Sequence, residues 1–176
     1  MGAVTKQGVP GESSLQRVSS EHPSLPPLGR ELHRQVANAF VLFGNYKHYH
    51  WQTYGPLFRD LHVLFDEFAK EALLSIDCLV ERIQAIGEDL PGHLITAIDL
   101  ATVPVATPHA TMREMVEEAA RNVLLVVTEM RDTARIAAEH DDQGTAQRVS
   151  QVVRVYEQHK WWFRDILSKR EGPYLV

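Results

Sequence analysis

The stretch that decides the fold runs from residue 50 to residue 66 and reads HWQTYGPLFRDLHVLFD. Gly55 and Pro56 interrupt it, and apolar residues recur three and four positions apart on both sides of the interruption. Glycine stops a helix and proline suits the first turn of the next one. The stretch therefore predicts two consecutive helices that fold back on each other at residues 55–56.

The same periodicity continues along most of the chain. It predicts four long helices, over residues 28–53, 57–87, 111–140 and 145–171. Thr111 is the predicted N-cap of the third helix, in a capping box with Glu114, and Thr145 is the predicted N-cap of the fourth. No alternating apolar pattern of useful length predicts a strand. The sequence thus predicts an all-α protein.

The connection between the second and third helices, residues 88–111, is long for a compact domain. Within it, residues 93–101 are predicted to form a short extra helix. Four long helices with one long crossover predict a four-helix bundle of ferritin-like connectivity.

The two ends of the chain differ from the bundle in composition. Residues 1–28 are rich in Gly, Pro and Ser without a period, so we expect a flexible arm, a bundle over 29–171 and a short tail over 172–176. The single cysteine, Cys78, excludes an internal disulfide framework and a Cys-rich metal site. The sequence has neither a run of ~18 apolar residues nor a signal-peptide core, so no membrane association and a cytoplasmic location are expected.

Two histidines and a carboxylate flank the interruption at residues 55–56. His50 lies five residues before Gly55 and His62 lies six after Pro56, and residues equally far from an antiparallel turn face each other. Asp66 follows His62 by one helical turn on the same face. We therefore expect the three side chains to converge. Two imidazoles and a carboxylate suit iron, with zinc as an alternative.

A second pair of carboxylates, Asp77 and Glu81, repeats the four-residue spacing. Asp77 lies about 16 Å along the helix from Asp66 at ~1.5 Å per residue, whereas a metal–ligand distance is about 2 Å. The pair can join the first set only from another chain, across a twofold axis near residues 71–72. Taken singly, each of these residues is more typical of packing or a solvated face; the joint pattern indicates a metal site.

The stretch 50–66, followed by Asp77 and Glu81, closely resembles the Dps family of mini-ferritins, DNA-binding proteins from starved cells. The family motif HWxxxGxxFxxLHxxxD is met at every ligand position, and the resemblance covers roughly residues 30–170. It implies twelve-subunit cages, built from twofold dimers, that oxidise ferrous iron and store ferric mineral. Hydrogen peroxide is the usual oxidant and oxygen the alternative, and the reaction protects against oxidative damage.

The resemblance also implies a role for each residue. The metal ligands, which are also the catalytic residues, would form a di-iron ferroxidase centre at the dimer interface: His50, His62 and Asp66 from one subunit, Asp77 and Glu81 from its partner. Glu81 would bridge the two irons. Because imidazoles bind metals as neutral groups, iron binding is expected to weaken as pH falls through ~6.5.

Two further roles follow from the resemblance. Trp51 would be a sacrificial, radical-trapping electron donor, with packing in the core as the alternative. Family cages have acidic pores near the turn between the third and fourth helices. Glu139, Asp141 and Asp142 are the candidates here, because an acidic channel attracts ferrous ions. The alternative is an ordinary solvated turn.

DNA binding does not follow from the charges. The net charge is −5, and the arm carries Lys6 and Arg17 against Glu12 and Glu21, so it is neutral apart from the terminal amine. Each phosphate contact needs a cation, so we expect no DNA binding at physiological salt. A nucleoid-binding structural protein with an accessory metal site stays open as the alternative function, and a zinc-holding cage as a third.

Overall fold

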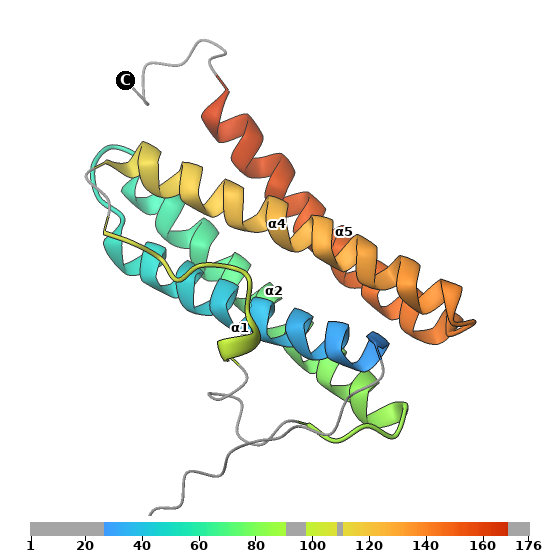
Figure 1. Cartoon of the computed structure of the whole chain (residues 1–176). Helices are drawn as coiled ribbons and strands as arrows, with labels where there is room; N and C mark the ends of the chain where they lie inside the picture. Colours follow the sequence, from blue (N-terminus) through green and yellow to red (C-terminus); the bar gives the residue numbers. More distant parts are fainter. Residues whose placement is uncertain (1–26, 91–97, 109–110, 169–176) are drawn as a thin grey trace, which may run out of the picture.

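Two antiparallel helix hairpins make up the bundle. α1 (Pro27–Gln52) pairs with α2 (Phe58–Ala85), and α4 (Met112–Glu139) pairs with α5 (Gln143–Leu167). α1 also packs on α4 and α2 on α5, so the four helices enclose one core (Figure 1). No strand occurs in residues 27–90, 98–108 or 111–168. The predicted all-α four-helix bundle is confirmed.

This computed structural model describes residues 27–90, 98–108 and 111–168. The predicted arm therefore lies outside the described residues, except for Pro27 and Leu28. These two residues begin α1 and Leu28 is buried, so the bundle starts two residues before the predicted boundary. The predicted tail over 172–176 also lies outside the described residues. None of the described helices combines the length and the apolar character needed to cross a membrane.

Helix ends follow the local signals in three places. Gly55, between α1 and α2, adopts a left-handed φ of 78° that a side chain would disfavour. After α2, Gly87 has a φ of 79°, and the N–H groups of Gly87 and Glu88 donate to carbonyls in the last helical turn, which is a Schellman motif. The predicted capping box of Thr111 and Glu114 is present.

The predicted cap of the fourth helix was wrong. α5 begins at Gln143 rather than after Thr145, and its N-cap is Asp142, whose carboxylate accepts a hydrogen bond from the Thr145 N–H at 2.9 Å. The Asp142 carboxylate accepts from the N–H of the third helical residue, as N-cap side chains do. Its negative charge also complements the positive end of the helix dipole. Thr145 is instead buried in the first turn of α5.

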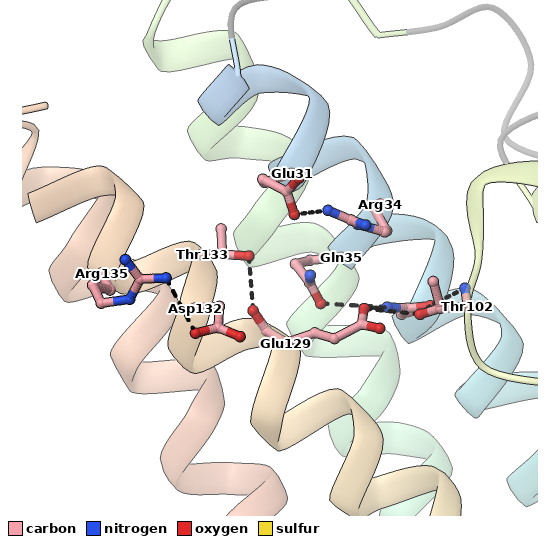
Figure 2. Close-up of polar contacts among 9 residues, drawn as sticks. Glu31, Arg34, Gln35, Thr102, Glu129, Asp132, Thr133 and Arg135 are labelled. Atoms are coloured by element: carbon pink, nitrogen blue, oxygen red, sulfur yellow. Dashed lines mark hydrogen bonds and ion pairs between the residues drawn. The ribbon is translucent and has the colours of Figure 1, made fainter. Parts of the chain in front are cut away.

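The crossover is held against α1 by two buried asparagines. Asn38 Oδ1 accepts hydrogen bonds from the N–H groups of Thr102 and Val103, at 2.8 and 3.1 Å. Asn45 Oδ1 accepts from the Ala106 N–H at 2.7 Å. The carboxylate of Glu129 on α4 accepts from both Asn38 and Thr102, so α1, the crossover and α4 meet at one polar cluster (Figure 2).

Part of the predicted crossover helix lies outside the described residues. Of residues 93–101, the structure describes the last four, and within them Ile98–Leu100 forms a single 3₁₀ turn, η1. η1 packs against α1.

Aromatic side chains fill the core beneath the α1–α2 hairpin. Tyr46 and Phe65 are fully buried, and the Tyr46 ring contacts those of Phe65, Phe68 and Phe163. Rings of this size dominate the apolar surface removed from water. They also fix the spacing of α1 and α2, and with it the positions of His50 and His62.

Candidate metal centre

His50 and His62 face each other across the α1–α2 turn. His50 lies in the last turn of α1 and His62 is the fifth residue of α2. Their rings stack with centroids 3.6 Å apart and an interplanar angle of 23°. Phe58, at the start of α2, stacks on His62 with centroids 5.1 Å apart. The predicted convergence of the two histidines is thus present in one chain.

Reciprocal hydrogen bonds fix both imidazoles. His50 Nδ1 lies 2.7 Å from the His62 carbonyl oxygen, and His62 Nδ1 lies 2.8 Å from the His50 carbonyl oxygen. A carbonyl can only accept, so each Nδ1 carries a hydrogen and donates it. The neutral ring then keeps its lone pair on Nε2, the nitrogen left for a metal. Donation by the other nitrogen to a carbonyl is typical of metal-binding histidine.

Asp66 lies one turn beyond His62, but lysines hold its carboxylate. Lys47 Nζ is 2.8 Å from Oδ1 and Lys70 Nζ is 2.8 Å from Oδ2. Hydrogen bonds and charge from Lys47 and then Lys70 hold the pKa of Asp66 well below its usual range, so the carboxylate stays ionised. The histidine and carboxylate spacings did not predict this arrangement, although the four-residue spacing of Asp66 and Lys70 is a signal for the second ion pair.

Asp77 and Glu81 lie further along α2, and both are exposed. In the part of the chain that the structure describes, no three His, Cys, Asp or Glu side chains are grouped so that they could hold a metal ion. One subunit therefore brings His50 and His62 together and leaves the carboxylates apart. The five-ligand set remains a prediction that involves a second chain.

An apolar patch separates the two halves of the predicted site on α2. Leu73 is 44% exposed and Leu74 is 67% exposed. They lie next to residues 71–72, where the sequence predicts a twofold axis. Solvent exposure of large apolar side chains is typical of a surface that another subunit covers.

The three predicted pore residues lie at the α4–α5 turn in different environments. Glu139 pairs with Arg135 at 2.8 Å, and Asp141 is exposed with a left-handed φ of 60°. Asp142 pairs with Arg82 at 2.7 Å in addition to capping α5. Burial opposes ionisation of Asp142, but hydrogen bonds from Thr145 and the charge of Arg82 outweigh it and lower the pKa.

Trp51 projects away from the core. Its side chain is 68% exposed, so the alternative that Trp51 fills the core of its own chain is wrong. The ammonium of Lys47 lies 5.7 Å from the centre of the Trp51 ring. The indole thus neighbours a lysine that also holds Asp66, beside the stacked histidines. Electron donation by Trp51 stays a prediction.

Known proteins are similar to this chain in both fold and sequence. A family model described as a ferritin-like domain matches residues 30–172. A protein of Brevibacillus brevis named DNA protection during starvation protein is 33% identical over 137 residues, which cover 78% of this chain and 92% of that protein.

Two solved structures extend the comparison. Dps from Thermosynechococcus elongatus superposes with a TM-score of 0.79 at 40% identity, covering 83% of this chain and 93% of that one. A Vibrio cholerae O1 Dps, described as a member of a broad superfamily of ferritin-like diiron-carboxylate proteins, superposes with a TM-score of 0.75 at 26% identity. It covers 80% of this chain and 89% of its own.

Proposed function

Because the chain belongs to the ferritin-like family and, within it, to the Dps proteins, we propose that it is a ferroxidase and iron-storage protein. It oxidises ferrous iron at a site shared by two subunits and keeps the ferric product as mineral inside a cage of twelve subunits. The activity protects the cytoplasm against iron and peroxide. Ferrous iron is the substrate, and hydrogen peroxide is the favoured oxidant over oxygen.

The reciprocal contacts of His50 Nδ1 and His62 Nδ1 with backbone carbonyls are the observation that carries this proposal. Both rings donate from Nδ1 to a backbone carbonyl and keep the Nε2 lone pair. Imidazole nitrogen with carboxylate oxygen is a ligand set for iron, and the described residues put no thiolate beside it to favour a softer metal. Zinc suits the same donors and serves as a competitor in the test below.

A dimer completes the ligand set in this proposal. Asp77 and Glu81 of a second subunit join His50, His62 and Asp66 when two copies of α2 cross antiparallel. The exposed Leu73 and Leu74 support this arrangement, because the crossing would bury them. Glu81 is then positioned to bridge two irons, and each dimer holds two equivalent sites.

Two irons at one site can reduce peroxide by two electrons without releasing hydroxyl radical. Each ferrous ion gives one electron, and hydrogen peroxide takes both electrons and two protons to become two molecules of water. No hydroxyl radical leaves the site. The carboxylates of Asp66, Asp77 and Glu81 offset the rising positive charge of the irons as they are oxidised.

Iron reaches the interior through the α4–α5 turn in this proposal. Asp141 is the exposed carboxylate there, whereas Arg82 holds Asp142 and Arg135 holds Glu139. Asp141 is therefore the member of the predicted pore set with the least neutralised charge. A ring of such carboxylates attracts ferrous ions electrostatically.

The rate of ferrous oxidation in wild type and His62→Ala tests the function. Ferric absorbance is followed after mixing with peroxide or with oxygen, with and without competing zinc. Wild type should oxidise iron faster than His62→Ala, and zinc should slow only wild type. His48→Gln is the matched control, since His48 lies on the same helix two residues from His50. Equal rates in wild type and His62→Ala would overturn the proposal.

Mixed assemblies test the sharing of the site between subunits. His62→Ala subunits lack a histidine ligand, and Glu81→Ala subunits lack the bridging carboxylate. When the two are unfolded together and reassembled, every mixed dimer gains one intact site and one doubly broken site. Activity should therefore return in the mixture although both parents are inactive. A mixture as inactive as its parents would place the ligands within one chain.

The relatives' names speak of DNA protection, which raises the question of DNA binding. We propose that this chain does not bind DNA at physiological salt, because its N-terminal stretch carries equal numbers of acidic and basic side chains. A gel shift with plasmid DNA at neutral pH tests this. A retarded band that weakens with added salt would favour the nucleoid-binding alternative.

A further inference from the structure

A hydrogen-bonded chain of three side chains runs from the core of the bundle to its surface. Tyr46 Oη on α1 lies 3.0 Å from His159 Nδ1 on α5, and His159 Nε2 lies 2.5 Å from Glu71 Oε2 on α2. Tyr46 and His159 are fully buried, whereas the side chain of Glu71 is 41% exposed. None of these three residues belongs to the proposed ligand set.

The direction of the two hydrogen bonds follows from their chemistry. An ionised carboxylate only accepts, so His159 Nε2 carries a hydrogen and donates it to Glu71. Burial lowers the pKa of His159, although Glu71 opposes this effect, and the imidazole is therefore neutral. Its Nδ1 then has a lone pair, which accepts the hydrogen of the Tyr46 hydroxyl.

Aromatic side chains surround the buried part of the Tyr46–His159–Glu71 hydrogen-bond chain. The His159 ring stacks on Phe68 with centroids 3.7 Å apart and an interplanar angle of 14°. The ring of Tyr156, another ionisable side chain, touches the His159 ring edge-on. Burial raises the pKa of Tyr46 well above its usual value, so the resting phenol keeps its proton.

A buried phenol with a base on its hydroxyl is easier to oxidise by one electron, because the proton can leave together with the electron. We propose that Tyr46 is a one-electron donor to oxidants formed at the iron site, with His159 and Glu71 as the path for its proton. The proposal rests on the ferroxidase function. Tyr46 precedes His50 by four residues, about 6 Å of helix rise. Its ring also contacts Phe65, the residue before Asp66.

The electron of Tyr46 goes to an oxidant formed from peroxide, and its proton leaves through His159 and Glu71. A ferrous ion that meets peroxide alone gives ferric ion, hydroxide and hydroxyl radical. Tyr46 supplies one electron, which reduces the hydroxyl radical to hydroxide. The hydroxyl proton of Tyr46 moves to His159 Nδ1 while the Nε2 proton of His159 moves to Glu71. A neutral tyrosyl radical remains, and Glu71 releases its proton to solvent, where it meets hydroxide to form water.

Freeze-quench electron paramagnetic resonance tests the assignment of the donor. The assembled protein is loaded with one ferrous ion per site and mixed with excess peroxide, so that single irons react. Wild type should show a tyrosyl radical whose spectrum narrows when tyrosine is ring-deuterated. The signal should be lost in Tyr46→Phe and kept in Tyr156→Phe. A tyrosyl signal that survives in Tyr46→Phe would overturn the proposal.

Glu71→Gln tests the proton path. The glutamine oxygen can still accept the hydrogen bond from His159 Nε2, but it cannot take the proton. Radical yield should fall, because the Nε2 proton of His159 then has no carboxylate to accept it. An unchanged yield would remove Glu71 from the proton path. The urea midpoint, measured alongside, reports any loss of folding.

An iron-free oxidant separates this proposal from the ferroxidase proposal. Photogenerated tris(bipyridine)ruthenium(III) is applied to the metal-free assembly, and the same variants are compared. A Tyr46 radical in this arm alone supports Tyr46 as an electron donor, but it contradicts the proposal that oxidants formed at the iron site oxidise it. Absence of a Tyr46 radical in both arms overturns the donor while leaving ferrous oxidation to be judged by its own rate.

Discussion

Three histidines of the bundle are held in two opposite ways. At the α1–α2 turn, His50 and His62 each give one ring nitrogen to a backbone carbonyl and keep the other for a ligand. In the core, His159 has both nitrogens hydrogen-bonded, to Tyr46 and to Glu71. The second nitrogen therefore decides the role of the residue: the pair at the turn is available for binding, whereas the core histidine connects three helices.

Loss of one histidine at the turn should have the largest effect, and it should appear mainly in activity. His50→Ala removes a proposed iron ligand, so ferrous oxidation should fall to the rate of iron in protein-free buffer. His50 is half-buried and donates one hydrogen bond, so the free energy of unfolding should fall by only about 1 kcal/mol. Stopped-flow oxidation and urea unfolding measure the two quantities. A stable variant that remains active would break the comparison.

Loss of the core histidine should appear in stability. His159→Leu leaves the buried Tyr46 hydroxyl without its acceptor, at a cost of about 1–3 kcal/mol in the free energy of unfolding. Adding Tyr46→Phe should restore part of this loss, because the stranded hydroxyl is then gone. Urea unfolding at fixed subunit concentration measures both variants. Simple addition of two separate losses would show that the hydrogen bond contributes little.

A dependence on pH should distinguish the core histidine further. As pH falls below ~6.5 the unfolded chain protonates residue 159, whereas the folded chain, with its lowered pKa, does so only at lower pH. The stability advantage of wild type over His159→Gln should therefore shrink as pH falls, by at most ~1.4 kcal/mol per pH unit. Urea titrations between about pH 7.5 and about pH 5.5 cover this window. An advantage that grows instead would mean that Glu71 keeps the imidazole charged.

The smallest expected effects concern the neighbouring Asp142 and Asp141. Like the histidines, they differ in whether the side chain is held by the fold or exposed for a ligand. Asp142 caps α5 and binds Arg82, so Asp142→Ala should cost about 1 kcal/mol of stability. Asp141→Asn should cost less, since Asp141 is exposed and asparagine tolerates its left-handed φ of 60°. Thermal unfolding measures both, and iron uptake should slow in Asp141→Asn. A larger stability loss in Asp141→Asn than in Asp142→Ala would contradict the assignment of Asp142 as the aspartate that stabilises the turn.

Local signals in the sequence predicted most of the fold. The steps of three and four residues placed all four helices, and the Thr111 capping box and Gly87 placed two of their ends within a residue or two. The N-cap of α5 was missed because Asp142 and Thr145 are both good caps three residues apart. Only the folded structure shows that Arg82 reaches Asp142 and fixes it at the cap.

The candidate site was predictable where its residues are close in sequence. His50 and His62 flank one short turn, so equal distances from that turn were enough to pair them. Tyr46, Glu71 and His159 come from three helices, and no spacing within one helix reports their meeting. The two asparagines that hold the crossover did leave a signal: Asn38 and Asn45 are seven residues apart, on one buried face of α1.

Those two asparagines give the crossover an unusual dynamic character. The amides of Thr102, Val103 and Ala106 lie outside any helix, yet each donates to a buried side chain of α1. Their hydrogens can exchange with solvent only when the crossover lifts from α1, an opening that also breaks the hydrogen bond from the Thr102 hydroxyl to Glu129 on α4. In deuterated water these three amides should therefore exchange as slowly as those of the helices beside them, and they would report the detachment of the crossover from the bundle.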